Sequence, residues 1–156
     1  MTIKIMSKAK AIAQSYKQYD NDKVIISISD PFDNQAKFNT LNKSIREILY
    51  LSFYDISEES KDIFNGYSPM VSEDAKKIAD FVNKWEDKVD EIWVHCECGV
   101  SRSSGIAMAI MEHLDMDLTP ILESTEYYPN VLCYKLTAES LKRIKEKEHH
   151  NGISNC

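Results

Sequence analysis

Short apolar runs alternate with amphipathic segments along this chain. Residues 2–6 (Thr-Ile-Lys-Ile-Met) switch between polar and apolar side chains at every position, which predicts a short strand. Residues 24–29 and 92–94 are nearly continuous β-branched or apolar runs, a pattern typical of strands that are covered on both faces. Residues 45–53 predict a further strand, most clearly from Ile48 onwards.

Helical periodicity lies between these strands. Ser7 can cap a helix that we expect to reach about Tyr19, and Ser72 can cap a second amphipathic helix. Residues 106–114 are apolar nearly all round, so their helix is expected in the middle of the fold. A last helix is expected over residues 130–147, beginning at Pro129-Asn130 near the loop described below.

Strands that alternate with helices predict an α/β fold. We expect a single domain with a mainly parallel central sheet of four to five strands flanked by helices. The 156 residues suit one domain, and no repeat or low-complexity linker divides them. The domain is therefore expected to cover residues 1–147, with residues 148–156 as a polar C-terminal tail.

Composition and charge narrow the range of partners. Apolar residues make up 43% and charged residues 28%, as in ordinary globular proteins. A formal net charge of -6 argues against nucleic acid or an anionic membrane as the main partner, because both attract clustered Lys and Arg. We find no signal-peptide core, no run of membrane-spanning length and no zinc-type spacing. The expectation is a cytoplasmic, monomeric protein without metal or cofactor.

The four cysteines stand at irregular positions, 96, 98, 133 and 156. This spacing is unlike a disulfide framework and favours thiols in a reducing compartment.

The candidate chemistry follows the apolar run 92–94. His95 and Cys96 come next, and after five residues Arg102 and Ser103 open the apolar helical segment. A cysteine at the start of a helix is favoured as thiolate, the reactive form. Backbone N–H groups between the two ends of this loop can surround one phosphate. The phosphate-binding residues are expected to be Glu97, Cys98, Gly99, Val100, Ser101 and Arg102.

Three side chains of the loop suit phosphate chemistry. Gly99 supplies the permissive backbone that a curled loop needs. The planar fork of Arg102 matches two phosphate oxygens, and the Ser103 hydroxyl can donate to the sulfur and help it leave. A Cys-x5-Arg-[Ser/Thr] match arises by chance in about one chain in a hundred of this composition.

The His95-Cys96-x5-Arg102-Ser103 motif resembles the active-site motif of the cysteine-dependent protein tyrosine phosphatase superfamily. The length and the order of elements look most like its compact dual-specificity-type members, notably small microbial ones. The resemblance covers most of the chain, with shorter matches at residues 26–31, 51–56 and 128–130.

The resemblance implies a role for each residue of the motif. Cys96 would be the nucleophile, Arg102 the phosphate clamp and Ser103 the residue that assists departure of the thiolate. His95 would be a non-reacting neighbour that orients the loop and favours the thiolate.

The resemblance also implies a general acid, an Asp on a loop after an earlier strand, which later acts as base. Asp55 directly follows the strand that ends at residues 51–53 and fits this place. Asp62 is the alternative, but its acidic surroundings are typical of a solvated surface.

The expected function is hydrolysis of phosphomonoesters, most of all protein phosphotyrosine and also phosphoserine or phosphothreonine, through a phosphocysteine on Cys96. Alternatives are a phosphoinositide or RNA 5′-phosphate phosphatase, an arsenate reductase or sulfur transferase, and a non-catalytic phosphate-binding module. Glu97 and the lack of lysine in the loop weigh against highly charged substrates.

Two further points stay open in the sequence. A phosphotyrosine pocket needs an aromatic wall, for which the candidates are Phe32, Tyr54, Tyr67 and Tyr127. Cys98 is either a small loop side chain or a second thiol that bonds to oxidised Cys96.

Overall fold

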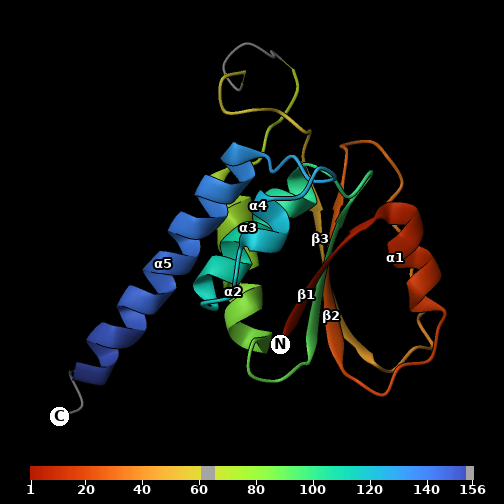
Figure 1. The fold of residues 1–156 in the computed structure, drawn as a ribbon, viewed down its shortest axis with the longest axis horizontal. Helices are drawn as coiled ribbons and strands as arrows, with labels where there is room; N and C mark the ends of the chain where they lie inside the picture. Colours follow the sequence, from red (N-terminus) through yellow and green to blue (C-terminus); the bar gives the residue numbers. More distant parts are fainter. Residues whose placement is uncertain (61–65, 154–156) are drawn as a thin grey trace.

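A sheet of parallel strands forms the middle layer of the molecule and has helical structure on both of its faces (Figure 1). The computed structural model describes residues 1–60 and 66–153. Within them, four strands pair in the order β1-β4-β2-β3, and every pair is parallel. The strands are β1 (Thr2–Ser7), β2 (Lys23–Ser29), β3 (Ile45–Ser52) and β4 (Glu91–Cys96). The predicted α/β class and parallel sheet are confirmed.

The two central strands are buried along their whole length. Every residue of β2 and β4 is buried, because helices cover both faces of the sheet there. This explains their continuous apolar runs, whereas the outer strands β1 and β3 are only partly buried.

One helix covers one face of the sheet and the others lie on the opposite side (Figure 1). α1 (Lys8–Ser15) packs on β1 and β4. The opposite layer contains α2 (Ser72–Trp85), α3 (Arg102–His113), α4 (Thr119–Leu122) and α5 (Val131–Ile153). Most of α3 is buried because it lies between β4 and α5, as its all-round apolar sequence predicts.

The hydrophobic core is split by the sheet. The larger part lies between the sheet and α2, α3 and α5. The smaller part lies beneath α1 and the segment that joins β2 to β3; it consists of Met6, Ala11, Ile25, Ala36, Phe38 and Trp93. The segment after β2 is therefore held on the body of the protein by apolar side chains.

Helix α1 is shorter than its periodicity predicts. It ends at Ser15, and the side-chain amide of Asn42 donates to the carbonyls of Ser15 and Lys17, at 2.8 and 3.2 Å. Tyr19 then packs edge-on against Trp93 with ring centroids 5.7 Å apart. The Asn42 amide thus takes up carbonyls that a longer helix would have bonded itself.

Two other helix ends also differ from expectation. Ser72 is the first residue of α2 rather than its cap, and the N–H of Val71 donates to the Asp74 carboxylate at 3.0 Å. α5 continues past Lys147 to Ile153. The added residues 148–153 are exposed and include Asn151 and Gly152, so helix propensity does not explain this extension.

No helix within residues 1–60 and 66–153 has the length and apolarity needed to cross a membrane.

Candidate active site

The candidate site lies at the edge of the sheet where the parallel strands end (Figure 1). Cys96 is the last residue of β4, Asp30 follows β2, and Asp55 follows β3 closely. Parallel strands bring their carboxyl ends to one edge, so residues far apart in the sequence meet there.

Gly99 allows the loop after β4 to lie against the end of β1. Its backbone φ is 73°, in the left-handed region. A Cβ at this position would lie 2.5 Å from the carbonyl carbon of Met6 and 2.6 Å from the nitrogen of Ser7. The N–H of Lys8 also donates to the carbonyl of Glu97 at 3.1 Å. The loop therefore curls tightly and has room only for glycine at position 99.

Cys96 is buried, and its side chain lies beside the first turn of α3. Its Sγ lies 3.1 Å from the Ser103 hydroxyl oxygen. Burial raises the pKa of the Cys96 thiol, but hydrogen bonds from the Ser103 hydroxyl and from the N–H groups of Ser103 and Gly99, together with the Arg102 charge, bring that pKa below its ordinary value. The site thus favours the thiolate, the nucleophilic form.

Arg102 is the first residue of α3 and is only 5% exposed. Its Nη1 donates to a carboxylate oxygen of Asp30 at 2.5 Å and to the carbonyl of Phe53 at 2.8 Å. Its Nε–H is a buried donor without a partner among the described residues. The bonds to Asp30 and Phe53 hold the guanidinium in place. Because leaving a buried donor unpaired is costly, the Nε–H has bonding capacity for an anion.

Asp55 contacts the same loop from the other side. One of its oxygens, Oδ1, accepts from the Ser101 hydroxyl at 2.9 Å and from the side-chain amide of Asn130 at 2.8 Å. The carboxylate is exposed beside the loop, where a general acid is needed. The alternative acid, Asp62, lies outside the described residues.

Asn130 joins three parts of the site. Its side-chain amide also donates to the carbonyl of Ile56 at 3.0 Å, and its oxygen accepts from the N–H of Cys133 at 3.0 Å, which caps α5. Its backbone N–H donates to the carbonyl of Ser101 at 3.0 Å. The sequence indicated the helix start through Pro129-Asn130, but nothing in it pointed to the contact with Asp55.

We compared the chain with known proteins. No family model and no curated protein matches it. Among solved structures, PTPMT1 in complex with PI(5)P is 17% identical with a TM-score of 0.56, over 94% of this chain and 94% of that chain. Tk-PTP in the active form is 13% identical with a TM-score of 0.54, over 92% of this chain and 93% of that chain.

A third structure is the human tyrosine phosphatase-like serine/threonine/tyrosine-interacting protein. It is 18% identical with a TM-score of 0.50, over 92% of this chain and 87% of that chain. The chain has the protein tyrosine phosphatase fold. At these identities the likeness establishes the fold, and the chemistry must be argued from the side chains.

Within this protein tyrosine phosphatase fold, His95 supports the loop from the buried side. Its Nδ1 lies 3.1 Å from the carbonyl of Cys96, so Nδ1 carries the hydrogen, and its Nε2 accepts from the Ser27 hydroxyl at 2.6 Å. Burial lowers the pKa of His95, which keeps the ring neutral. His95 is thus placed to orient the backbone of Cys96.

The two thiols of the loop differ in exposure. Cys98 is exposed whereas Cys96 is buried, and both are free thiols. Residues 1–60 and 66–153 contain no group of three or more His, Cys, Asp or Glu that could hold a metal ion.

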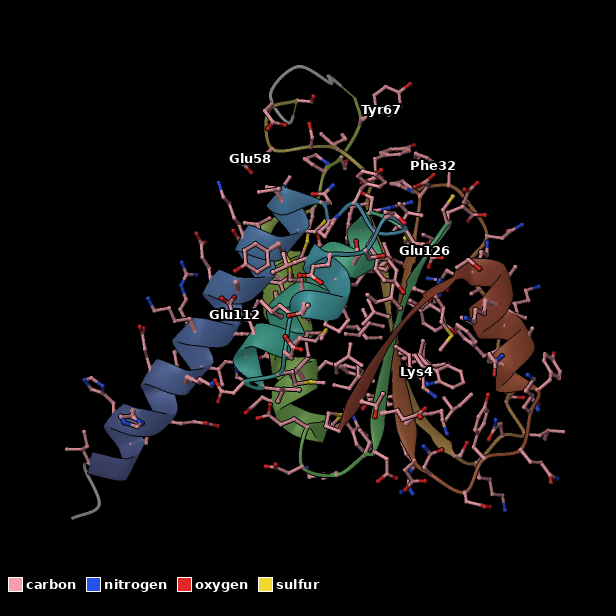
Figure 2. All side chains as sticks on the ribbon, in the orientation of Figure 1. Lys4, Phe32, Glu58, Tyr67, Glu112 and Glu126 are labelled. Carbon is pink, nitrogen blue, oxygen red and sulfur yellow. The ribbon has the colours of Figure 1, made fainter. Side chains whose placement is uncertain are left out.

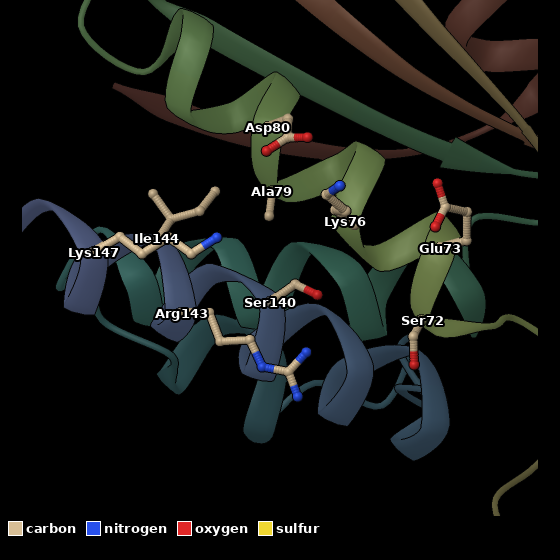
Figure 3. Close-up of a pocket in the computed structure, with 9 residues that line it drawn as sticks. All are labelled: Ser72, Glu73, Lys76, Ala79, Asp80, Ser140, Arg143, Ile144 and Lys147. Atoms are coloured by element: carbon tan, nitrogen blue, oxygen red, sulfur yellow. The ribbon is translucent and has the colours of Figure 1, made fainter.

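The phosphatase fold also contains a groove of about 250 Å³ between α2 and α5 (Figure 3). Side chains of both charges line it, including Lys76, Asp80 and Arg143, but none of the candidate residues does. This groove is therefore separate from the candidate site at the strand ends.

Proposed function

We propose that this protein is a phosphatase that hydrolyses phosphomonoesters, preferentially protein phosphotyrosine, through a phosphocysteine on Cys96. The observation that carries the proposal is the placement of Cys96 and Arg102 at the two ends of one curled loop. The thiol has a lowered pKa, and the guanidinium is buried with an Nε–H that has no partner among the described residues. A nucleophile and an anion clamp on one loop suit a phosphate ester.

In the first proposed step, the Cys96 thiolate attacks phosphorus. A sulfur–phosphorus bond forms, the ester bond breaks, and Asp55 as a carboxylic acid gives its proton to the departing oxygen. Arg102 and the N–H groups of residues 97–102 bind the remaining phosphate oxygens and stabilise the charge that develops on them.

In the second proposed step, water attacks the phosphocysteine. The Asp55 carboxylate removes a proton from that water, and the sulfur–phosphorus bond breaks to release phosphate. The Ser103 hydroxyl, 3.1 Å from Sγ, donates a hydrogen bond to the departing sulfur. The proposed reaction uses no metal or cofactor.

The charge around the loop favours a phosphorylated protein over a polyanionic substrate. Asp30 and Asp55 lie at the loop, Glu97 is part of it, and residues 97–101 contain no lysine. Additional phosphate groups would be repelled by these carboxylates. The second candidate is a phosphoinositide, because PTPMT1, which shares the fold, has been solved with PI(5)P.

Replacement of the nucleophile tests the mechanism. We expect Cys96→Ser to abolish hydrolysis of p-nitrophenyl phosphate while inorganic phosphate still binds, since Arg102 and the loop are retained. Acid-quenched wild-type protein should carry a phosphoryl group that peptide mapping assigns to Cys96, whereas Cys98→Ser should behave like wild type. Turnover by Cys96→Ser at the wild-type rate would contradict the mechanism. Hydrolysis assays then rank the candidate substrates, which are phosphotyrosine peptides, phosphothreonine peptides and phosphoinositides.

A further inference from the structure

β1 is an edge strand whose outer side is open. Within the part of the chain that the structure describes it pairs only with β4, and the N–H of Thr2 donates to the carbonyl of Asp90 at 2.9 Å. In a parallel ladder alternate residues bond to the same neighbour, so the N–H and C=O groups of Ile3 and Ile5 point away from β4. The hydrogen bonds among residues 1–60 and 66–153 include none to these outward groups. They are therefore available to another strand.

The two edges of the sheet differ in how they are protected. Charged side chains and breaks in register commonly protect an edge from pairing with another chain. β3, at the opposite edge, has Arg46 and Glu47 near its start and a register shift against β2. β1 pairs in regular register, and its only charged side chain, Lys4, is tied to Glu91 of the neighbouring strand at 2.7 Å. The β1 edge thus has little of the usual protection.

A concavity of about 390 Å³ lies beside this edge. Residues 3–6 of β1 form one side of it, and Lys10 of α1 and Tyr127 lie on its other walls. α1 covers one face of the sheet, whereas Tyr127 packs with Ile3 and Ile5 on the larger core at the opposite face. A strand that entered the concavity would therefore have α1 on one face and Tyr127 on the other.

The charge of the concavity is positive in a protein whose formal net charge is -6. Two lysines, Lys4 (labelled in Figure 2) and Lys10, line it, and none of its described lining residues is a carboxylate. Glu91 offsets the charge of Lys4. Lys10 is exposed and forms no ion pair with any described residue, so its charge is available to an acidic ligand.

We propose that the β1 edge binds an extended acidic segment of a partner protein, which adds to the sheet as a further strand. The outward backbone groups of Ile3 and Ile5 supply the hydrogen bonds, as in other cases of strand addition. Side chains of a strand alternate between its faces, so acidic residues on one face meet Lys10 while apolar residues on the other pack beside Tyr127. The preferred segment therefore alternates acidic and apolar residues. Binding does not involve Cys96 and is independent of the proposed phosphatase function.

Amide hydrogen exchange of the full chain, followed by NMR, tests the pairing. The probe is a terminally blocked eight-residue peptide of alternating glutamate and valine. In the free protein we expect the N–H groups of Ile3 and Ile5 to exchange at least about tenfold faster than those of Lys4 and Met6, which bond to β4. A saturating concentration of the peptide should remove this difference.

Fluorescence anisotropy with the labelled peptide tests the role of charge. Lys10→Glu should weaken binding at least about tenfold, and Lys10→Arg should bind like wild type. Lys142→Glu, the same charge change at an exposed position of α5, is the matched control and should leave the affinity within about twofold. The same peptide with N-methylated backbone amides should not bind, because it cannot donate hydrogen bonds to the edge.

Two results would overturn the inference directly. They are fast exchange of the Ile3 and Ile5 amides at millimolar peptide, and equal binding of the N-methylated peptide. Protection of both amides in the free protein that grows with protein concentration would assign the edge to a second copy of this chain and would also overturn it. Cys96→Ser should bind the peptide like wild type, which separates this surface from the proposed catalytic function.

Discussion

Both hydrogen bonds that hold Asp55 end on the same carboxylate oxygen. Oδ1 accepts from Ser101 and Asn130, and these bonds fix the orientation of the carboxylate. In the proposed mechanism, Oδ2 would then carry the transferred proton while Oδ1 keeps these two bonds.

Asp55→Asn should slow phenyl phosphate hydrolysis by about a hundredfold and p-nitrophenyl phosphate hydrolysis much less. The reason is that a good leaving group departs without a proton, whereas a poor one needs the acid. Steady-state kcat with a series of aryl phosphates measures this as a steeper dependence on leaving-group pKa. Equal losses on both substrates would move the acid role away from Asp55, with Asp62 as the next residue to replace.

Asn130→Ser should separate the cap of α5 from the support of Asp55. Serine can still accept from the N–H of Cys133 as a helix cap, but it is too short to reach Asp55. We expect stability to fall by no more than about 0.5 kcal/mol, and kcat for phenyl phosphate to fall about tenfold.

Asn130→Ala provides the control, because it removes the cap as well as the bonds to Asp55 and to the Ile56 carbonyl, and it should cost about 1 kcal/mol in urea unfolding. Equal phenyl phosphate activity in Asn130→Ser and wild type would show that the bond to Asp55 does not support the acid.

The lowered pKa of Cys96 should appear in the stability of the protein as well as in its reactivity. Between the folded pKa and the ordinary value near 9, the unfolded chain binds more protons at this thiol than the folded one. The difference in the free energy of unfolding between wild type and Cys96→Ser should therefore increase as pH rises through this window. Below the window, the contribution of the thiolate to stability is lost. Urea unfolding at several pH values measures the difference. A difference independent of pH would contradict a stabilised thiolate.

At the residue level, the motif was predictable because its parts are adjacent in sequence. Cys96, Arg102 and Ser103 lie on one loop, so strand and helix patterns were enough to place them. Pairings such as Asp30 with Arg102 or Asn130 with Asp55 depend on which strands are neighbours in the sheet. That order is not written in any local pattern.

Among the elements, the curled loop is the one with the least tolerance for change. Gly99→Ala meets two penalties, a φ of 73° and backbone atoms of Met6 and Ser7 within 2.6 Å of the added Cβ. We expect a loss of at least about 2 kcal/mol in urea unfolding together with most of the activity.

Gly66→Ala is the matched control for this prediction. Its φ is 85°, but a Cβ there has no neighbour within 4 Å among the residues that the structure describes, so only the conformational cost of about 1 kcal/mol should remain. Equal effects at positions 66 and 99 would show that the contact with β1 does not constrain the loop.

Strands were predicted more reliably than helix ends, for a physical reason. A strand buried on both faces must be apolar throughout, and β2 and β4 show this directly. The end of α1 instead depends on an amide contributed by Asn42, from a distant segment. The end of α5 lies in exposed residues beyond Lys147, where no hydrophobic pattern marks where the helix stops.

On the scale of the whole molecule, α5 extends beyond the body at its C-terminal end (Figure 1). Residues 148–153 are exposed, so their removal uncovers no core. A chain that ends at Lys147 should keep its Tm within about 2 °C and its kcat/KM for p-nitrophenyl phosphate, because surface changes alter stability little. Calorimetry and steady-state kinetics check this. A fall of more than about 5 °C would show that the domain needs these residues.

The strand order also dictates when the protein can assemble as it is synthesised. Within the described residues β1 pairs only with β4, which begins at Glu91, whereas β1 ends at Ser7. At ribosomal rates of about 5 to 20 residues per second, β1 waits roughly 4 to 17 s for its partner. β2 and β3 can pair earlier, but they cannot complete the sheet without β4 between β2 and β1. The loop that carries Cys96 emerges together with the end of that missing strand, and Asn130 emerges later still. A nascent chain therefore exposes its first strand and α1 until the Cys96–Arg102 loop itself arrives, and the proposed activity can begin only once the sheet is complete.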